Sequence, residues 1–160
     1  MKTAHRYAAA ACAGLLALLA GCSGSGSYEM AVCALVDVSG TYAEEKGNVA
    51  RLIKAGILPQ MAPGDSLFFI TIDSNSFSEE NLVGKVTLDY RPSRANRQKL
   101  DLAGDLDTFA AGTGRSDFTD ISGAMMLCGD YLKDTAARTR LMFIFSDMQE
   151  DLQPGVLRAF

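Results

Sequence analysis

The sequence predicts a three-layer α/β fold with a doubly wound, mostly parallel sheet between helices. Three observations support this prediction. Several short apolar runs are uninterrupted rather than alternating, which is typical of strands buried on both faces. Segments with apolar residues at helical spacing separate these runs. Three of the predicted strands end at an acidic residue, Asp37, Asp73 or Asp147, at the carboxyl edge where such sheets bind ligands.

The first half of the domain contains two predicted strands joined by a helix. Residues 31–36 form a continuous apolar run that ends at Asp37. A helix is predicted from residue 44 to about residue 58, because four residues share one face at helical spacing, namely Val49, Ile53, Gly56 and Ile57. Pro59 disfavours helix at the residue before it, and residues 63–65 predict a turn. Residues 66–73 form the second strand.

The second half adds two strands and two helices. Residues 83–90 alternate between apolar and polar side chains, which predicts a half-exposed edge strand. Ser93 is predicted to cap a helix that runs to about residue 110, with an apolar stripe of Leu102, Leu106 and Phe109. Residues 112–117 predict a loop. A further helix is predicted over residues 119–134, with one apolar face made of Ile121, Met125, Cys128 and Leu132. Residues 141–145 predict another buried strand, and residues 153–160 the start of a helix.

The N-terminus has the pattern of a secretory signal over residues 1–21. Lys2 and Arg6 precede an apolar run, residues 7–20, which is shorter than the 20 or so residues that span a bilayer. Residues 19–22, Leu-Ala-Gly-Cys, resemble the lipobox of bacterial lipoproteins. The resemblance implies that Cys22 becomes the first residue, carries acyl chains such as palmitate and anchors the chain to a membrane. An ordinary secreted protein cut nearby is the alternative.

The residues after Cys22 form a predicted tether of Ser and Gly, residues 22–28 including the cysteine. In lipoproteins of bacteria with two membranes, a serine at the position of Ser23 implies export to the outer membrane, facing the periplasm, rather than retention in the inner membrane. The domain itself is then expected to cover residues 29–160.

The composition excludes several classes of function. With 48% hydrophobic and 21% charged residues in 160, the chain is typical of one globular domain. Loss of the signal removes Lys2 and Arg6 and takes the net charge from −4 to −6, which argues against nucleic acid as a partner. The signal also contains His5, the one histidine. Serine–histidine catalysis and histidine-bearing zinc sites are therefore not expected.

Two cysteines, Cys33 and Cys128, remain outside the signal and the lipidation site. Both lie in apolar segments, so we expect them to be unpaired small hydrophobic residues. A disulfide is the alternative, since an exported protein permits one if the two Cα atoms lie within about 7 Å.

Oxygen-bearing side chains cluster at the predicted carboxyl edge of the sheet. Asp37, Ser39 and Thr41 follow the first strand, and Gly40 lets the backbone turn so that both hydroxyls can face one ion. Thr119 lies at the start of a helix, and Asp147 follows a later strand. Such hard oxygen ligands are those that Mg²⁺ prefers. Taken singly, each residue could instead be a helix cap or a local hydrogen-bonding group in a turn.

In these positions the chain resembles the von Willebrand factor A domain over about residues 30–151. The metal-ion-dependent adhesion site of that family combines Asp-x-Ser-x-Ser, a later loop Thr and a later strand-end Asp. Five residues match it, with Thr41 in place of the usual second Ser, namely Asp37, Ser39, Thr41, Thr119 and Asp147. The resemblance implies a Rossmann-like fold in which the hydroxyls bind Mg²⁺, Mn²⁺ or Ca²⁺ and the two acids commonly act through water.

The function implied is metal-dependent protein binding, in which a partner's Asp or Glu completes the coordination of the ion; no residue is an evident general base, so we do not expect an enzyme. Two alternatives remain. One is a phosphotransferase of the haloacid dehalogenase type, with Asp37 as nucleophile and Asp147 as magnesium ligand, although Ser39 stands where such hydrolases need an acid. The other is a metal-free structural lipoprotein.

Because the family normally continues for two more strands, we also expect an incomplete domain whose last predicted strand is an apolar sheet edge.

Overall fold

The computed structural model describes residues 29–155. The predicted signal, Cys22, the tether and most of the predicted C-terminal helix lie outside these residues. The described chain is an α/β structure with a four-stranded sheet in the order β3-β2-β1-β4. Its strands are β1 (Met30–Asp37), β2 (Ser66–Ile72), β3 (Leu82–Thr87) and β4 (Thr139–Phe145). β1 pairs in parallel with both β2 and β4, whereas β3 pairs antiparallel with β2.

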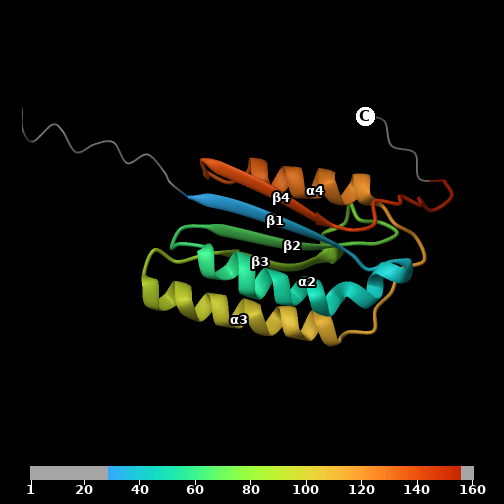
Figure 1. Cartoon of the computed structure of the whole chain (residues 1–160). Coiled ribbons are helices and arrows are strands. Elements are labelled where there is room, and N and C mark those ends of the chain that lie inside the picture. Colours follow the sequence, from blue (N-terminus) through green and yellow to red (C-terminus); the bar gives the residue numbers. More distant parts are fainter. Residues whose placement is uncertain (1–28, 156–160) are drawn as a thin grey trace, which may run out of the picture.

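The sheet lies between two layers of helix (Figure 1). On one face lie α2 (Lys46–Leu52) and α3 (Pro92–Ala111), and on the other lies α4 (Ile121–Lys133). β1 supplies both cores, since Val32, Ala34 and Val36 face α2 and α3 while alternate residues face α4, namely Ala31, Cys33 and Leu35. The uninterrupted apolar run of β1 follows from this burial on both faces. The three-layer, mostly parallel α/β prediction is confirmed.

The first predicted helix is a continuous helical segment of four parts. A 3₁₀ helix η2 (Gly40–Glu45) leads into α2, which is followed by a π-helical segment η3 (Ile53–Ile57) and a 3₁₀ turn η4 (Leu58–Gln60). Val49 and Ile53 are buried as predicted. The wider π turn brings Leu58 into the core, whereas Gly56 and Ile57 are only half-buried. Pro59 stands in the first turn of η4, where its missing N–H costs no bond.

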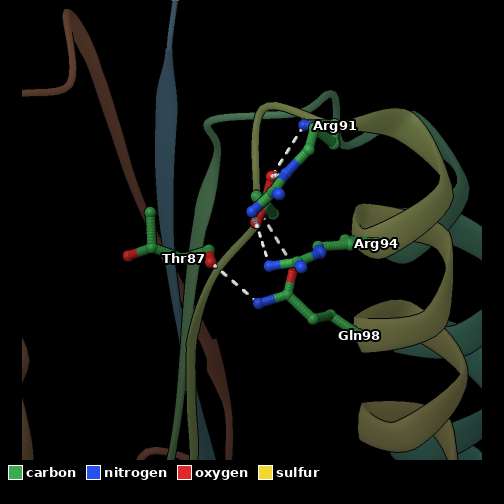
Figure 2. Close-up of polar contacts among 5 residues, drawn as sticks. Thr87, Arg91, Arg94 and Gln98 are labelled. Atoms are coloured by element: carbon green, nitrogen blue, oxygen red, sulfur yellow. Dashed lines mark hydrogen bonds and ion pairs between the residues drawn. The ribbon is translucent and has the colours of Figure 1, made fainter.

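A polar network joins the end of β3 to the start of α3 (Figure 2). The helix begins at Pro92 with Arg91 as its N-cap residue, so the prediction that Ser93 caps it is wrong. Asp89 instead accepts hydrogen bonds from the backbone and guanidinium of Arg91, and Gln98 donates to the carbonyl of Thr87. Proline at the first helical position explains the earlier start, because its fixed φ already suits a helix. The predicted stripe of Leu102, Leu106 and Phe109 faces the core.

The predicted apolar face of α4 is confirmed at three of its four residues and is wrong at Met125. Ile121, Cys128 and Leu132 are buried, but Met125 is 41% exposed, and Ala124 and Leu127 occupy the core instead. Because α4 packs directly on β1, the Cα atoms of Cys33 and Cys128 lie 6.1 Å apart and the residues form a disulfide. The expectation of two unpaired cysteines is therefore wrong. Sequence spacing alone does not reveal a pairing over 95 residues.

Strand β4 is less buried than predicted, because it forms one edge of the described sheet. Leu141 is 37% and Phe143 is 39% exposed. Both side chains alternate with Met142 and Ile144, which pack against the α4 side. On the other face, Phe145 packs against the core that α2 and α3 form, whereas Leu141 and Phe143 are not part of that core. The expectation of an apolar sheet edge is confirmed. Within residues 29–155, no helix is both long and apolar enough to cross a bilayer.

Candidate functional site

The site begins where β1 ends at Asp37. This carboxylate is 1% exposed, and its Oδ1 accepts hydrogen bonds from the backbone N–H of Ser39 at 2.8 Å and from the Ser39 hydroxyl at 2.5 Å. Gly40 then turns the chain into η2 with a φ of +46°, a conformation that favours glycine. The local sequence thus holds one carboxylate and one hydroxyl together at the carboxyl edge of the sheet.

Thr119 reaches this pair from a distant part of the chain. Its hydroxyl forms a hydrogen bond with that of Ser39, 80 residues away in sequence, and both residues are buried. The Ser39 hydroxyl has one hydrogen, which it donates to Asp37, so Thr119 is the donor to Ser39. Two backbone hydrogen bonds with Asp151, at 2.7 and 3.0 Å, hold Thr119 in place.

Asp120, rather than Thr119, caps helix α4. Its Oδ1 accepts from the backbone N–H of Gly123 at 2.8 Å, and its Oδ2 accepts from that of Ser76 at 3.1 Å. Asp120 is fully buried. The interpretation of Thr119 as a helix cap is wrong. The Thr119 hydroxyl thus has no capping role and faces the site.

The end of β4 supplies two further residues. The Ser146 hydroxyl donates to Asp37 Oδ2 at 2.8 Å and accepts from the backbone N–H of Met148. Asp147 is exposed, and its Oδ1 accepts from the N–H of Gln149 at 2.9 Å. Met148, which follows Asp147, has a φ of 62°, which is unusual for a residue with a side chain. Ser146 was missed as a site residue, although the parallel register that pairs Val36 with Phe145 predicts that it lies beside Asp37.

The pKa of Tyr42 reflects both burial and the negative charge at this edge of the sheet. This pKa is raised above the ordinary value, first by burial and then by the negative charges of Glu45, Asp37 and Asp147. Both predicted metal-site acids therefore act on one tyrosine. The side chain of Thr41, just before it, lies outside what the structure describes, so its predicted role as a ligand stays a prediction.

Asp73, one of the three predicted strand-end acids, and Ser116 have structural roles near this edge. Asp73, the strand-end acid of β2, accepts from the backbone of Asn75 and the amide of Asn81. Ser116 pairs with β1 through a backbone hydrogen bond to Val38, and its hydroxyl donates to the carbonyl of Phe118. These contacts fix the loops around the site without adding ligands to it.

The donor set fits a hard divalent cation. Asp37, Ser39 and Thr119 bring a carboxylate and two hydroxyls into mutual contact, and oxygen donors of this kind suit Mg²⁺, Mn²⁺ or Ca²⁺. Among residues 29–155, no group of three or more His, Cys, Asp or Glu side chains is arranged to hold a metal. A metal site here would therefore depend on the hydroxyl groups.

The position of this cluster in the topology is that of a ligand site. From β1 the chain passes through α2 to β2 on one face, while α4 leads into β4 on the other. Ligands of open α/β sheets bind where the connections diverge in this way. Comparison with protein-family models, curated proteins and solved structures finds no significant match.

Proposed function

We propose that this chain is a lipid-anchored, divalent-metal-dependent protein-binding module of the von Willebrand factor A type. The observation that carries the proposal is the contact among Asp37, Ser39 and Thr119, three residues from two distant segments that match the family motif. The separate capping of α4 by Asp120 supports it, because a purely structural Thr119 would be expected to cap that helix.

In this proposal, Ser39, Thr41 and Thr119 hold the ion, and the two acids, Asp37 and Asp147, act at its periphery. The ion would supply a Lewis-acidic position for a carboxylate of the partner. The hydroxyls carry no charge, so the ion keeps affinity for an additional anionic ligand. Ser146 positions Asp37 by donating to Oδ2. Asp147 lies exposed at the rim, where it can meet a partner protein.

The anchor places this module at a membrane surface. Acylation of Cys22 and the Ser/Gly residues after it would hold the domain near the outer membrane, facing the periplasm. Expression in a bacterium with two membranes, followed by fractionation and mass spectrometry of the N-terminal peptide, tests this part. The expected result is an acylated Cys22 in the outer membrane, and recovery of the intact protein from the inner membrane would refute the assignment.

Calorimetric titration of the purified chain with Mg²⁺ and Mn²⁺ tests the metal site. We expect saturable binding that Asp37→Asn and Thr119→Val each weaken at least tenfold. Asp73→Asn is the matched control, since it changes another strand-end acid and should leave the affinity unchanged. Circular dichroism confirms that each variant is folded.

Two results would overturn the proposal. Absence of metal binding by the folded native chain would favour a metal-free structural protein. Turnover of p-nitrophenyl phosphate that Asp37→Asn abolishes would favour the phosphotransferase with Asp37 as nucleophile. Both oxygens of Asp37 already accept hydrogen bonds from serine hydroxyls, which does not favour Asp37 as a nucleophile.

A further inference from the structure

A cavity of about 620 Å³ lies beside the cluster of site residues, at the carboxyl ends of β1 and β2. Its volume is within the range of pockets that hold small molecules. Its apolar lining includes Val38, Phe109 and Phe118. Lys46 and Arg115 add two positive charges to the lining. We call this cavity the Lys46 pocket.

Lys46 is a buried cation without a counter-ion. It is 6% exposed, and its ammonium donates to the carbonyl of Gly114, which also lines the pocket. An ammonium has three donors, and Lys46 takes part in no ion pair with a carboxylate in the part of the chain that the structure describes. A buried charge is costly unless a partner of opposite sign compensates it.

Neither acid in the lining, Asp73 or Asp117, forms an ion pair with Lys46 within residues 29–155. Asp73 accepts hydrogen bonds from Asn75 and Asn81, and Asp117 is exposed. Arg115 lies on the same loop as Gly114, and its side chain is exposed. The Lys46 pocket therefore combines a buried ammonium, a guanidinium at its rim and an apolar wall. A buried ammonium without an ion-pair partner, beside apolar side chains, suits an organic anion.

We propose that the Lys46 pocket binds a small organic carboxylate with an aromatic or aliphatic body. The carboxylate would lie against Lys46 and Arg115, and the body would pack against Phe109 and Phe118. Two hydrogen bonds already hold the loop in place, because the backbone N–H of Ser116 donates to the carbonyl of Val38 and the ammonium of Lys46 donates to the carbonyl of Gly114. The pocket is distinct from the cluster of Asp37, Ser39 and Thr119, none of which lines it.

Titration of the ¹⁵N-labelled chain with phenylacetate, followed by NMR, tests the proposal. We expect saturable shifts of the amides of Gly114, Arg115 and Ser116. Phenylacetamide has nearly the same shape without the charge, so it should bind at least tenfold more weakly. Arg115→Gln and Lys46→Met should each weaken phenylacetate binding at least fivefold.

Lys99→Met is the matched control for Lys46→Met. The ammonium of Lys99 also donates to a backbone carbonyl, that of Met61, but it lies outside the pocket. This variant, like Asp37→Asn, should bind phenylacetate as the native chain does. Lys46→Met also removes the hydrogen bond to Gly114 and so releases one contact of the loop. Arg115→Gln is the second variant, because Arg115 is exposed and its substitution leaves that hydrogen bond in place. Absence of saturable shifts, equal binding of phenylacetamide, or native affinity in both pocket variants would overturn the proposal.

Discussion

Thr119 and Asp120 are adjacent in sequence but have separate roles at the start of α4. Asp120 satisfies the backbone N–H groups of Gly123 and Ser76 and is fully buried. Among residues 29–155, the Thr119 side chain bonds only the Ser39 hydroxyl. Loss of a buried acceptor leaves its donors without a partner, whereas loss of one hydroxyl removes a single bond. Stability and metal binding are therefore expected to depend on different members of this pair.

We predict that Asp120→Ala lowers the free energy of unfolding by about 2–3 kcal/mol, because it removes the helix cap and leaves the Ser76 N–H buried without its acceptor. Thr119→Val should cost about 1 kcal/mol. Urea unfolding followed by circular dichroism measures both values. Equal losses in the two variants would contradict the division of roles.

At the start of α3, the pKa of Asp89 lies well below its ordinary value, chiefly because Arg91 donates side-chain and backbone hydrogen bonds to the carboxylate (Figure 2). A lowered pKa in the folded state means that this carboxylate stabilises the fold above its unfolded-state pKa, near pH 4. The stabilisation is then lost as the pH falls below 4 through the folded-state pKa.

We predict that Asp89 titrates below the usual aspartate range and that Arg91→Gln moves its pKa back toward the ordinary value. Carboxyl ¹³C NMR against pH measures both shifts. In Asp89→Asn, the free energy of unfolding should decrease less between pH 4 and pH 2 than it does in the native chain. The difference is expected to be small because the pair lies at the surface. A native Asp89 that titrates at the ordinary value would refute the assignment.

At the scale of elements, apolar patterns predicted the strands well because β1 and β2 are buried on both faces. The same patterns failed where packing depends on neighbours. Met125 has the spacing of a core residue, yet the short Ala124 lets α4 approach β1 and leaves Met125 exposed. The run in β4 predicts full burial, but the described sheet has no strand beyond it.

The candidate site was predictable only in part, for the same reason. Asp37, Ser39 and Thr119 could be named because a spaced motif marks them. Ser146 has no motif of its own, and only the parallel register of β1 with β4 brings it to Asp37. The role of Asp120 depends on the position of Ser76, which lies 44 residues away. Such contacts require the fold to be known.

The disulfide between Cys33 and Cys128 links the two elements that lead to the site, β1 and α4. A crosslink that closes a loop of about this length stabilises a protein by about 4 kcal/mol, largely by restricting the unfolded chain. We predict that the double variant Cys33→Ala/Cys128→Ala loses about that much in urea unfolding. Reductant should destabilise the native chain but leave this variant unchanged. Equal stability of the two chains would exclude a crosslink in solution.

At the scale of the whole molecule, the two edges of the described sheet differ. β3 is the strand at one edge, where it pairs antiparallel with β2. Its side chains Val83 and Val86 pack against the core that α3 helps to form. β4 leaves its outer backbone groups unpaired within residues 29–155 and exposes Leu141 and Phe143. An apolar edge strand of this kind favours pairing with another chain.

We therefore predict that the chain associates with itself through β4 at high concentration. A lysine on an exposed edge strand opposes such pairing, because two copies would bring like charges together and bury them. Phe143→Lys should raise the dissociation constant, measured by sedimentation equilibrium, at least tenfold. Leu100→Lys is the matched control, since Leu100 is 67% exposed on α3 and the substitution adds the same charge away from β4. A native chain that stays monomeric at millimolar concentration, or a control that dissociates as readily as Phe143→Lys, would contradict association through this edge.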